Sequence, residues 1–289
     1  MMSRIQTIPS LPLRSSSAHK GMFGHGLIVG GAVGMTGAVA IAGMSCLRAG
    51  VGLLTLAIPE KSLGIVASFD PCFMTLPLPC NEQGRLSDDA FKTLQLKLQS
   101  STCIAIGPGL GRSEASDKIV ISLFEQSSVP VIADADALNA LSESVDWRNL
   151  SCGGNRILTP HPGEWHRLCG VPANDRDAQV EAANRIASQT GHVIILKGSK
   201  TWVTDGKNGY ENTTGNPSMA TGGSGDCLTG ILTALVCQGM NCMNAAILSV
   251  FLHGRAGDLA HQELGTPSSQ PTDIVRYLPD AFRSLNRTT

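Results

Sequence analysis

The feature that most constrains the fold is a regular alternation between short apolar segments and longer amphipathic ones. Six short segments are apolar at nearly every position, which is typical of strands covered on both faces. The segments between them have the spacing of amphipathic helices. This alternation predicts an α/β fold with a mostly parallel central sheet and helices on both faces. The expected strands are residues 26–31, 52–58, 102–107, 129–134, 156–159 and 192–197, and the expected helices are residues 36–49, 87–98, 113–126 and 175–189.

The two ends of the chain differ from this alternating middle. The first 18 residues are rich in Ser, Pro and Arg, and we expect them to form a loosely ordered leader or surface arm. Residues 201–205 and 209–211 flank Gly206 and predict a short hairpin. From Gly225 onward the chain is expected to be mostly helical. No repeat, long linker or change in composition divides residues 19–289, so we expect a single domain.

An uncharged segment from Gly26 to Leu47 is long enough to raise the question of a membrane span. It contains six glycines, however, and joins an expected strand to an expected helix. It also begins well after the N-terminus and has no convincing cleavage site, which disfavours a secretory signal. We therefore interpret it as buried α/β core and expect no membrane association.

Charge and cysteine content narrow the class of protein further. The net charge of −1 provides no electrostatic footprint for nucleic acid, so no nucleic-acid partner is expected. Nine cysteines at irregular positions, without a C-x-x-C pair, predict buried, reduced thiols and not a zinc site. Such thiols suit a cytoplasmic protein.

The segment with the clearest chemistry is a glycine-rich loop directly before an apolar helix. Gly222, Gly223 and Gly225 fill three of four positions, and Asp226 follows at the expected start of the helix. Such a loop suits a phosphate or a phosphoryl group in transfer, because backbone N–H groups converge there and the helix N-terminus adds positive potential. A carboxylate at that position can accept the proton of an attacking hydroxyl. The glycines alone are equally compatible with a turn in which Asp226 caps the helix.

This loop resembles the anion-hole signature of the ribokinase-like superfamily, and within it the chain is most similar to the NAD(P)H-hydrate dehydratases. The resemblance covers roughly residues 11–285, and its weight comes from several blocks that match in order. It implies a ribokinase-like three-layer sandwich. The blocks are residues 19–21 with 24–25, 30–31 with 37–38, 48–52, 107–111 (Gly-Pro-Gly-Leu-Gly), 134–139 (Asp-Ala-Asp-Ala-Leu-Asn), 159–164 (Thr-Pro-His-Pro-Gly-Glu), 196–198 and 222–226.

The resemblance also implies roles for individual residues, although most of them have an ordinary structural interpretation too. A lone histidine at a strand end usually only makes hydrogen bonds, and a lysine there is usually a surface charge. The spacing of His161, Glu164 and His166 fits no zinc motif, and no Walker A sequence occurs. The implied catalytic residues are Asp226, Gly225, Gly223 and Gly222. The implied substrate contacts are Ala38, Gly109 or Gly111, His161 and Asp226, and the implied nucleotide contacts are Lys197, Gly198, Ser199, Lys200, Thr201 and Gly225.

Asp134 and Asp136 follow an expected strand, where α/β sheets bind ligands. Two carboxylates there could hold Mg²⁺ through water or position a substrate hydroxyl. For Asp136, capping the next helix is about as probable. Neither residue is assigned as a certain metal ligand, and Mg²⁺ is expected as a cofactor alongside the nucleotide.

The activity implied by the resemblance is repair of hydrated NADH or NADPH. Hydroxide is a poor leaving group, so the ring hydroxyl would first be phosphorylated by ADP or ATP and then eliminated as phosphate. ADP is the expected donor, while the sequence does not discriminate NADH hydrate from NADPH hydrate. The main alternative is a small-molecule hydroxymethyl kinase of the same superfamily, of the thiazole or pyrimidine type. A regulator without catalysis ranks last, because the glycine loop and Asp226 are intact.

The resemblance carries expectations about partners as well. Many members of the family are fused to an epimerase domain that interconverts the two hydrate stereoisomers. A chain of 289 residues leaves no room for that domain, so a separate epimerase is expected. Similar proteins assemble as homotetramers, which makes a homo-oligomer the expectation here.

Overall fold

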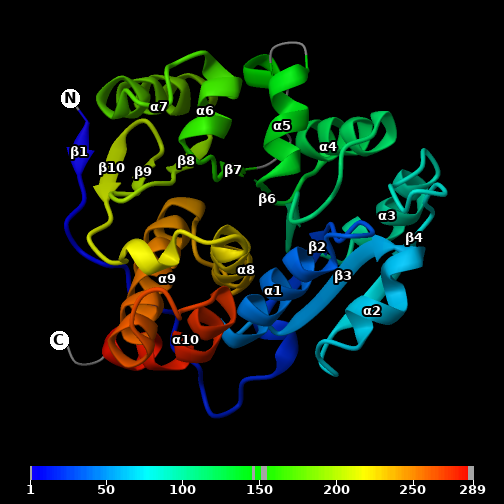
Figure 1. Ribbon diagram of the computed structural model, residues 1–289, viewed down its shortest axis with the longest axis horizontal. Helices are drawn as coiled ribbons and strands as arrows, with labels where there is room; N and C mark the ends of the chain where they lie inside the picture. The colour runs from blue at the N-terminus through cyan, green and yellow to red at the C-terminus, as the bar shows by residue number, and fades with distance from the viewer. Residues whose placement is uncertain (1, 145–146, 151–154, 286–289) are drawn as a thin grey trace.

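The computed structural model describes residues 2–144, 147–150 and 155–285, and these residues form three layers (Figure 1). The middle layer is a ten-stranded sheet with the order β1-β10-β9-β8-β7-β6-β5-β2-β3-β4. Neighbouring strands are parallel, except that β9 runs antiparallel to both β8 and β10. The strands are β1 (Ser3–Arg4), β2 (His25–Val29), β3 (Leu53–Pro59), β4 (Met74–Leu78), β5 (Cys103–Ile106), β6 (Val131–Ala133), β7 (Arg156–Leu158), β8 (Val193–Leu196), β9 (Trp202–Thr204) and β10 (Asn208–Glu211).

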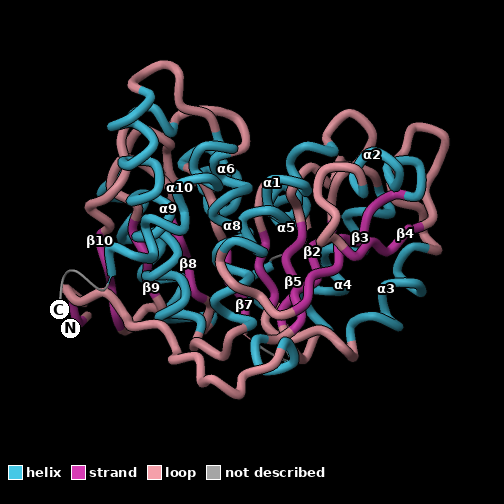
Figure 2. The backbone as a smooth tube through the Cα atoms, turned by 90° about the horizontal axis from the view of Figure 1, so that it is seen from below, coloured by secondary structure: helices cyan, strands magenta, loops and turns pink. Residues whose placement is uncertain are grey.

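Helices cover both faces of this sheet (Figures 1 and 2). One face is covered by α1 (Thr36–Arg48), α2 (Leu63–Ala67), α8 (Ser224–Cys237), α9 (Cys242–Leu264) and α10 (Pro271–Leu285). The other is covered by α3 (Ala90–Leu98), α4 (Glu114–Gln126), α5 (Asp136–Glu143), α6 (Pro162–Cys169) and α7 (Arg176–Thr190). Short 3₁₀ turns are η1 (Lys20–Phe23), η2 (Glu60–Ser62), η3 (Trp147–Asn149) and η4 (Pro217–Met219).

The central strands are apolar throughout because each face of the sheet packs into its own core. In β5, Cys103 and Ala105 belong to the core beneath α1 and α8, whereas Ile104 and Ile106 belong to the core beneath α4 and α5. This is the alternation that a strand imposes on successive side chains. The predicted α/β architecture, mostly parallel and covered on both faces, is therefore confirmed.

Several elements were not predicted from the sequence. Strand β4 lies at an edge of the sheet, has partly exposed residues and contains Pro77, so it lacks the continuous apolar pattern of a central strand. Helices α5 and α6 have eight residues each and begin within four residues of the ends of β6 and β7, and neither was among the expected helices. The predicted hairpin is present as β9 and β10, with Gly206 in the turn at φ +81°.

The N-terminal segment crosses the molecule before the first central strand begins. Strand β1 pairs in parallel with β10, and Arg4 lies over the Trp202 ring at 5.5 Å. Further along, Arg14 lies 3.7 Å from the centre of the Phe23 ring and donates hydrogen bonds to Gly50 O and to Gln238 Oε1. The first 18 residues are therefore attached to the rest of the protein at Arg4, near their start, and at Arg14, near their end.

The uncharged segment of residues 26–47 forms β2, a turn and most of α1. None of the described helices is both long enough and apolar enough to cross a membrane. Of the cysteines, Cys152 lies outside the described residues, and the described ones are free thiols. Most are buried, but Cys72 is exposed, so the prediction of burial is wrong there.

Candidate active site

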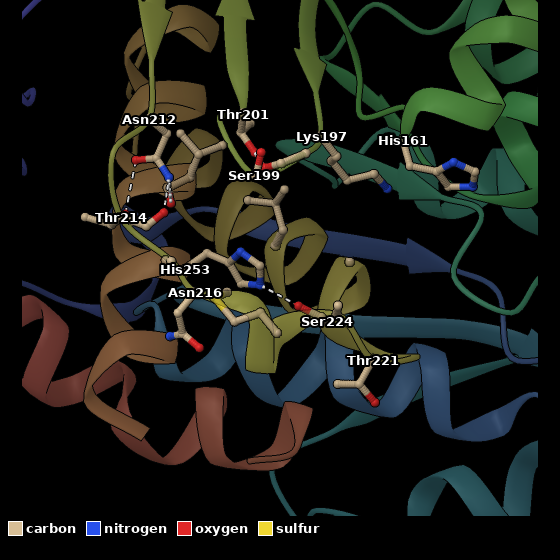
Figure 3. A pocket seen from close by; sticks show the side chains of 18 of the residues that line it. His161, Lys197, Ser199, Thr201, Asn212, Thr214, Asn216, Thr221, Ser224 and His253 are labelled. Carbon is tan, nitrogen blue, oxygen red and sulfur yellow. Dashed lines mark hydrogen bonds between the residues drawn. The ribbon is translucent and has the colours of Figure 1, made fainter. Parts of the chain in front are cut away.

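A pocket of about 720 Å³ opens at the carboxyl ends of β6, β7 and β8, beside the N-terminus of α8 (Figure 3). This is the edge at which parallel α/β sheets bind ligands. Asp134 and Lys197 come directly after β6 and β8, His161 comes three residues after the end of β7, and Asp226 comes from the first turn of α8. The pocket therefore brings together residues that are more than 90 positions apart in the chain.

The glycine loop exposes backbone N–H groups to this pocket. Gly223 is the N-cap of α8 and has φ +98°, a left-handed conformation that glycine adopts without strain. Within the described residues, the N–H groups of Gly223 and Gly225 donate no hydrogen bond. No atom lies within 4 Å of where a Cβ would stand on Gly222, and only Lys197 Nζ does so at Gly225, at 3.5 Å. The loop is thus an open cradle for an anion at a helix N-terminus.

Asp226 is the carboxylate of this cradle. Burial and the nearby negative charge of Asp134 raise the pKa of Asp226 to about 7, although Lys197 acts in the opposite direction. A carboxylate with that pKa is well matched to general base catalysis near neutral pH, because it is partly deprotonated and still basic. The geometry supports a proton acceptor beside a bound phosphate.

Lys197 supplies a positive charge to the pocket. Its ammonium group lies 2.8 Å from Asp134 Oδ1 and 3.8 Å from Glu164 Oε2. Burial opposes the charged form, but Asp134 and Glu164 outweigh it and raise the pKa of Lys197. Lys197 therefore stays protonated at physiological pH and can face phosphate oxygens.

Asp134 is almost completely buried, and both of its oxygens already accept hydrogen bonds. Oδ1 accepts from Thr159 Oγ1 at 2.7 Å and from Lys197 Nζ, and Oδ2 accepts from Thr229 Oγ1 at 2.7 Å. Burial disfavours its charge, but these partners hold the pKa of Asp134 below its usual value.

Asp136 faces a different place from Asp134. Between them Ala135 has φ +47°, a conformation that non-glycine residues rarely adopt. Asp136 Oδ2 accepts a hydrogen bond from Gly111 N at 2.9 Å, and Asp136 is not among the residues that line the pocket. No group of three or more His, Cys, Asp or Glu side chains in the described part of the chain could hold a metal ion.

His161 forms the N-cap of α6 and also lines the pocket. Its Nδ1 accepts hydrogen bonds from Gly163 N and Glu164 N, and Glu164 Oε2 accepts one from His161 N in return. Burial and the charge of Lys197 lower the pKa of His161, so the ring is neutral. Because Nδ1 is an acceptor, the proton resides on Nε2. His161 Nε2 lies 3.4 Å from Glu164 Oε1, so the ring caps α6 and also lines the pocket.

The segment after β8 forms another wall. Gly198, Ser199 and Thr201 line the pocket, whereas Lys200 does not. Arg176 fixes this segment by donating to the carbonyl oxygens of Leu196, Lys197 and Lys200 at 3.0, 3.1 and 2.6 Å. Five of the six nucleotide contacts expected from the sequence thus lie on one loop held by Arg176, and the sixth, Gly225, lies in the first turn of α8.

The opposite wall was missed by the sequence analysis. It includes Asn212, Thr214 and Asn216 from the segment after β10, and His253 from α9 (Figure 3). Asn216 Nδ2 donates to Asp258 Oδ1 at 2.9 Å, and His253 Nε2 lies 3.2 Å from Ser224 Oγ. Burial lowers the pKa of His253 to about 4, so this ring is neutral. The available signal was a histidine within an otherwise apolar helical stretch.

The remaining expected substrate contacts do not line this pocket. Ala38, Gly109 and Gly111 lie around the N-terminus of α1 and the turn after β5. A Cβ on Gly109 would stand 3.1 Å from the Cβ of Ala38, so these two residues are neighbours. Gly222 also lies outside the lining, while Gly223, Gly225 and Asp226 belong to it. The expected site residues therefore divide into a pocket group and a group beside α1.

Comparison with known proteins identifies the class first. The fold is ribokinase-like: the chain superposes with a TM-score of 0.79 on a ribokinase-like superfamily protein from Enterococcus faecalis, at 26% identity and with 98% and 96% of the two chains covered. Residues 26–280 match the NAD(P)H-hydrate dehydratase family, and the chain belongs to that family.

Individual relatives agree with this assignment. The ADP-dependent (S)-NAD(P)H-hydrate dehydratase of Bacillus subtilis is 34% identical over 95% of this chain and 94% of its own length. A structure of the ADP/ATP-dependent enzyme from that organism, co-crystallised with ATP and Mg²⁺, has a TM-score of 0.81, with 30% identity and coverage of 95% and 94%. The bifunctional NAD(P)H-hydrate repair enzyme of Moorella thermoacetica is 43% identical over 95% of this chain, but the match spans only 52% of that protein. This chain thus spans about half the length of its bifunctional relatives.

Proposed function

We propose that this chain dehydrates hydrated NADH or NADPH and consumes ADP or ATP in the process. The observation that carries the proposal is Asp226, a carboxylate with a pKa of about 7 beside a glycine cradle and a charged lysine. Membership of the NAD(P)H-hydrate dehydratase family supports the choice of substrate. The name of the Bacillus subtilis relative supports ADP as the donor.

The chemistry begins with phosphoryl transfer. The ring hydroxyl oxygen attacks the terminal phosphorus of the nucleotide, and Asp226 accepts the hydroxyl proton as the O–P bond forms. The bond from that phosphorus to the bridging oxygen breaks, which leaves AMP from ADP or ADP from ATP. The amides of residues 222–225 and the Lys197 ammonium would stabilise the charge on the moving phosphoryl group. Mg²⁺ held by the donor phosphates would neutralise part of their charge.

Elimination follows on the phosphorylated ring. The lone pair of the ring nitrogen expels phosphate, and the adjacent carbon then loses a proton, which restores the dihydropyridine. With ADP the sum is hydrated NADH plus ADP giving NADH, AMP, phosphate and a proton. His161 lines the pocket as a neutral ring, where it would contact bound substrate.

The test uses purified protein, chemically prepared hydrated NADH, Mg²⁺ and either ADP or ATP. We expect nucleotide-dependent recovery of the near-ultraviolet absorbance of the reduced ring. Asp226→Asn should lower turnover by about 10²–10⁴-fold with nucleotide binding largely intact. Recovery by the variant at near the wild-type rate would remove Asp226 from the role of base. Absence of recovery in folded, nucleotide-binding protein would overturn the function, and phosphorylation of hydroxymethyl thiazole or pyrimidine substrates would then be measured.

We infer in addition that the protein acts in the cytoplasm as a homotetramer, beside an epimerase that interconverts the hydrate stereoisomers. The epimerase proposal is supported by the bifunctional names of several relatives. We also infer that residues 19–289 fold as one domain, because both cores pack on the same sheet. Size-exclusion chromatography with light scattering tests the tetramer, and a monomer would exclude it.

A further inference from the structure

The pocket contains a closed set of hydrogen bonds around one carboxylate that the reaction described above does not use. Asp134 accepts hydrogen bonds from Thr159 in the segment after β7, from Lys197 in the segment after β8 and from Thr229 in α8. Thr159 and Thr229 are fully buried. Three elements of the pocket are therefore joined at a single side chain.

Thr229 gives this set a direct link to the base. It lies three residues after Asp226 on the same helix, so the two side chains lie on one side of α8. The Thr229–Asp134 hydrogen bond of 2.7 Å fixes the second turn of α8, one turn after Asp226, against the residue that follows β6. A movement of Asp134 would therefore also move α8 near Asp226.

Lys197 lies at different distances from the carboxylates around it. Its ammonium group lies in contact with Asp134, at 2.8 Å, and at 3.8 Å from Glu164, whereas no ion pair with Asp226 exists within the described residues. Glu164 is already engaged in the cap of α6 through His161 N. Asp134 is thus the carboxylate that holds the lysine.

We propose that Asp134 is a positioning residue of this enzyme: it retains the Lys197 ammonium group and so leaves the Asp226 carboxylate free to act as the base. The inference rests on the proposed function and deepens it. Without Asp134, Lys197 would pair with the nearest remaining carboxylates, and Asp226 is one of them. An ion-paired Asp226 is a weaker proton acceptor.

The electrostatic surroundings of Asp226 agree with this arrangement. The charges that act on Asp226 are those of Asp134, which follows β6, and Lys197, which follows β8. The histidines that line the same pocket are His161 at the start of α6 and His253 on α9. Both histidines have lowered pKa values and are neutral. Burial raises the pKa of Asp226, Asp134 raises it further and Lys197 lowers it. Removal of the Asp134 charge would shift the balance toward Lys197.

The experiment compares the pH dependence of kcat/KM for the wild type and Asp134→Asn. The acid limb of the wild-type profile is expected near pH 7, where Asp226 is half protonated. In Asp134→Asn that limb should move down by about one pH unit, and maximal kcat should fall because the base is weaker. KM for the nucleotide should rise, because Lys197 is no longer held. Asp205→Asn is the matched control: this carboxylate lies in the β9–β10 turn, accepts backbone hydrogen bonds from Lys207 and Asn208, and should leave the profile unchanged.

A second pair of variants keeps the charge and removes one hydrogen bond. Thr229→Val should move the acid limb to lower pH by less than Asp134→Asn does, because the Asp134 charge remains and only its attachment to α8 is lost. Thr229→Ser retains the hydroxyl and should resemble the wild type. If Asp134→Asn fails to fold, this pair decides the question. An acid limb that stays in place in folded Asp134→Asn, or in Thr229→Val, would overturn the proposal.

A direct titration separates this inference from the proposed function. NMR of ¹³C-carboxyl-labelled aspartate, assigned with Asp226→Asn, reports protonation of Asp226 without any substrate. A fall in the Asp226 pKa in Asp134→Asn supports the positioning role even if hydrated NADH proves not to be the substrate. An unchanged titration would overturn that role while leaving the dehydratase assay unaffected.

Discussion

Two glycine-rich segments end at the same edge of the sheet, and they use glycine for different reasons. In the turn after β5, a Cβ on Gly107 would collide with the carbonyl oxygen of Asp134, and one on Gly109 would collide with the carbonyl oxygen of Met35. In the loop before α8, Gly222 has free space around it, and Gly225 meets only the end of a lysine side chain. The first segment is packed, and the second is open at Gly222 and Gly225, whereas a Cβ on Gly223 would stand 3.1 Å from both Ile41 and Pro271.

The difference teaches that a glycine in a sequence motif does not by itself indicate ligand contact. At residues 107–111 the glycines allow backbone segments to approach one another, which fixes Asp134 in place. At residues 222–225 they leave backbone N–H groups accessible to an anion. The same contrast holds for the neighbouring carboxylates, because Asp134 is saturated with hydrogen bonds, whereas Asp226 accepts none within the described residues.

The largest effect on stability is expected from the packed turn. Gly107→Ala introduces a methyl group against Asp134 O at φ +129°, and should cost about 3 kcal/mol or more of unfolding free energy. Gly191→Ala is the matched control, since Gly191 has φ +71° but open space around it, and should cost about 1 kcal/mol. Urea denaturation measures both. Equal costs would show that backbone conformation, and not packing, requires Gly107.

The open loop should respond in the opposite way. Gly225→Ala is expected to lower turnover by roughly 10²-fold, because the methyl group would occupy the anion cradle near Lys197. Its melting temperature should be unchanged or slightly higher, because alanine favours the helix more than glycine does. Gly64→Ala in α2, also at an open position, should leave turnover unchanged. A large loss of stability in Gly225→Ala would contradict the description of this loop as open.

The unpaired carboxylate of the open loop should reduce stability at high pH. The pKa of Asp226 is raised by folding to about 7, so its neutral form is favoured in the fold, and wild-type stability falls as pH rises from about 4 through 7. Asp226→Asn should therefore be more stable than the wild type at pH 8, by on the order of 1–3 kcal/mol. The advantage should shrink steadily as the pH is lowered toward 5. A constant difference between pH 5 and pH 8 would show that Asp226 has an ordinary pKa.

The smallest effect on stability is expected at Gly222. Gly222→Ala meets no atom within 4 Å and has no left-handed backbone conformation, so the unfolding free energy should change by no more than about 0.5 kcal/mol. Its turnover should fall less than that of Gly225→Ala, because Gly222 lies outside the pocket lining. Scanning calorimetry and the dehydratase assay measure the two quantities. A larger loss of turnover in Gly222→Ala than in Gly225→Ala would show that Gly222, and not Gly225, is the more important glycine for the reaction.

The sequence predicted the architecture well because the central strands are buried on both faces and carry a continuous apolar pattern. Strand β4 escaped prediction because it is an edge strand with Pro77. Helices α5 and α6 escaped because they are short and their first residues, Asp136 and Pro162, belong to motifs that were interpreted as site segments. Local pattern thus accounts for the core and not for the short elements around the site.

For the site, the sequence indicated residues that follow strands or precede α8, since those positions share one edge of a parallel sheet. It did not indicate His253 or Asn212, which reach the pocket only because α9 packs beside α8 and the chain returns from β10. Nor did it show that Asp134 is enclosed by Thr159 and Thr229, because hydrogen bonds between residues 25 and 95 positions apart leave no local pattern.

The position of Trp202 provides an internal optical reporter. Trp202 is the first residue of β9 and directly follows Thr201 of the pocket wall. Its indole is buried, and Nε1 donates a hydrogen bond to Asn184 Oδ1 at 2.9 Å. The chain has only three tryptophans, and Arg4 of β1 lies over this one. A nucleotide that contacts residues 198–201 would change the environment of this ring, so intrinsic fluorescence can follow nucleotide binding in unlabelled protein. Trp202→Phe identifies the part of the emission that comes from this residue.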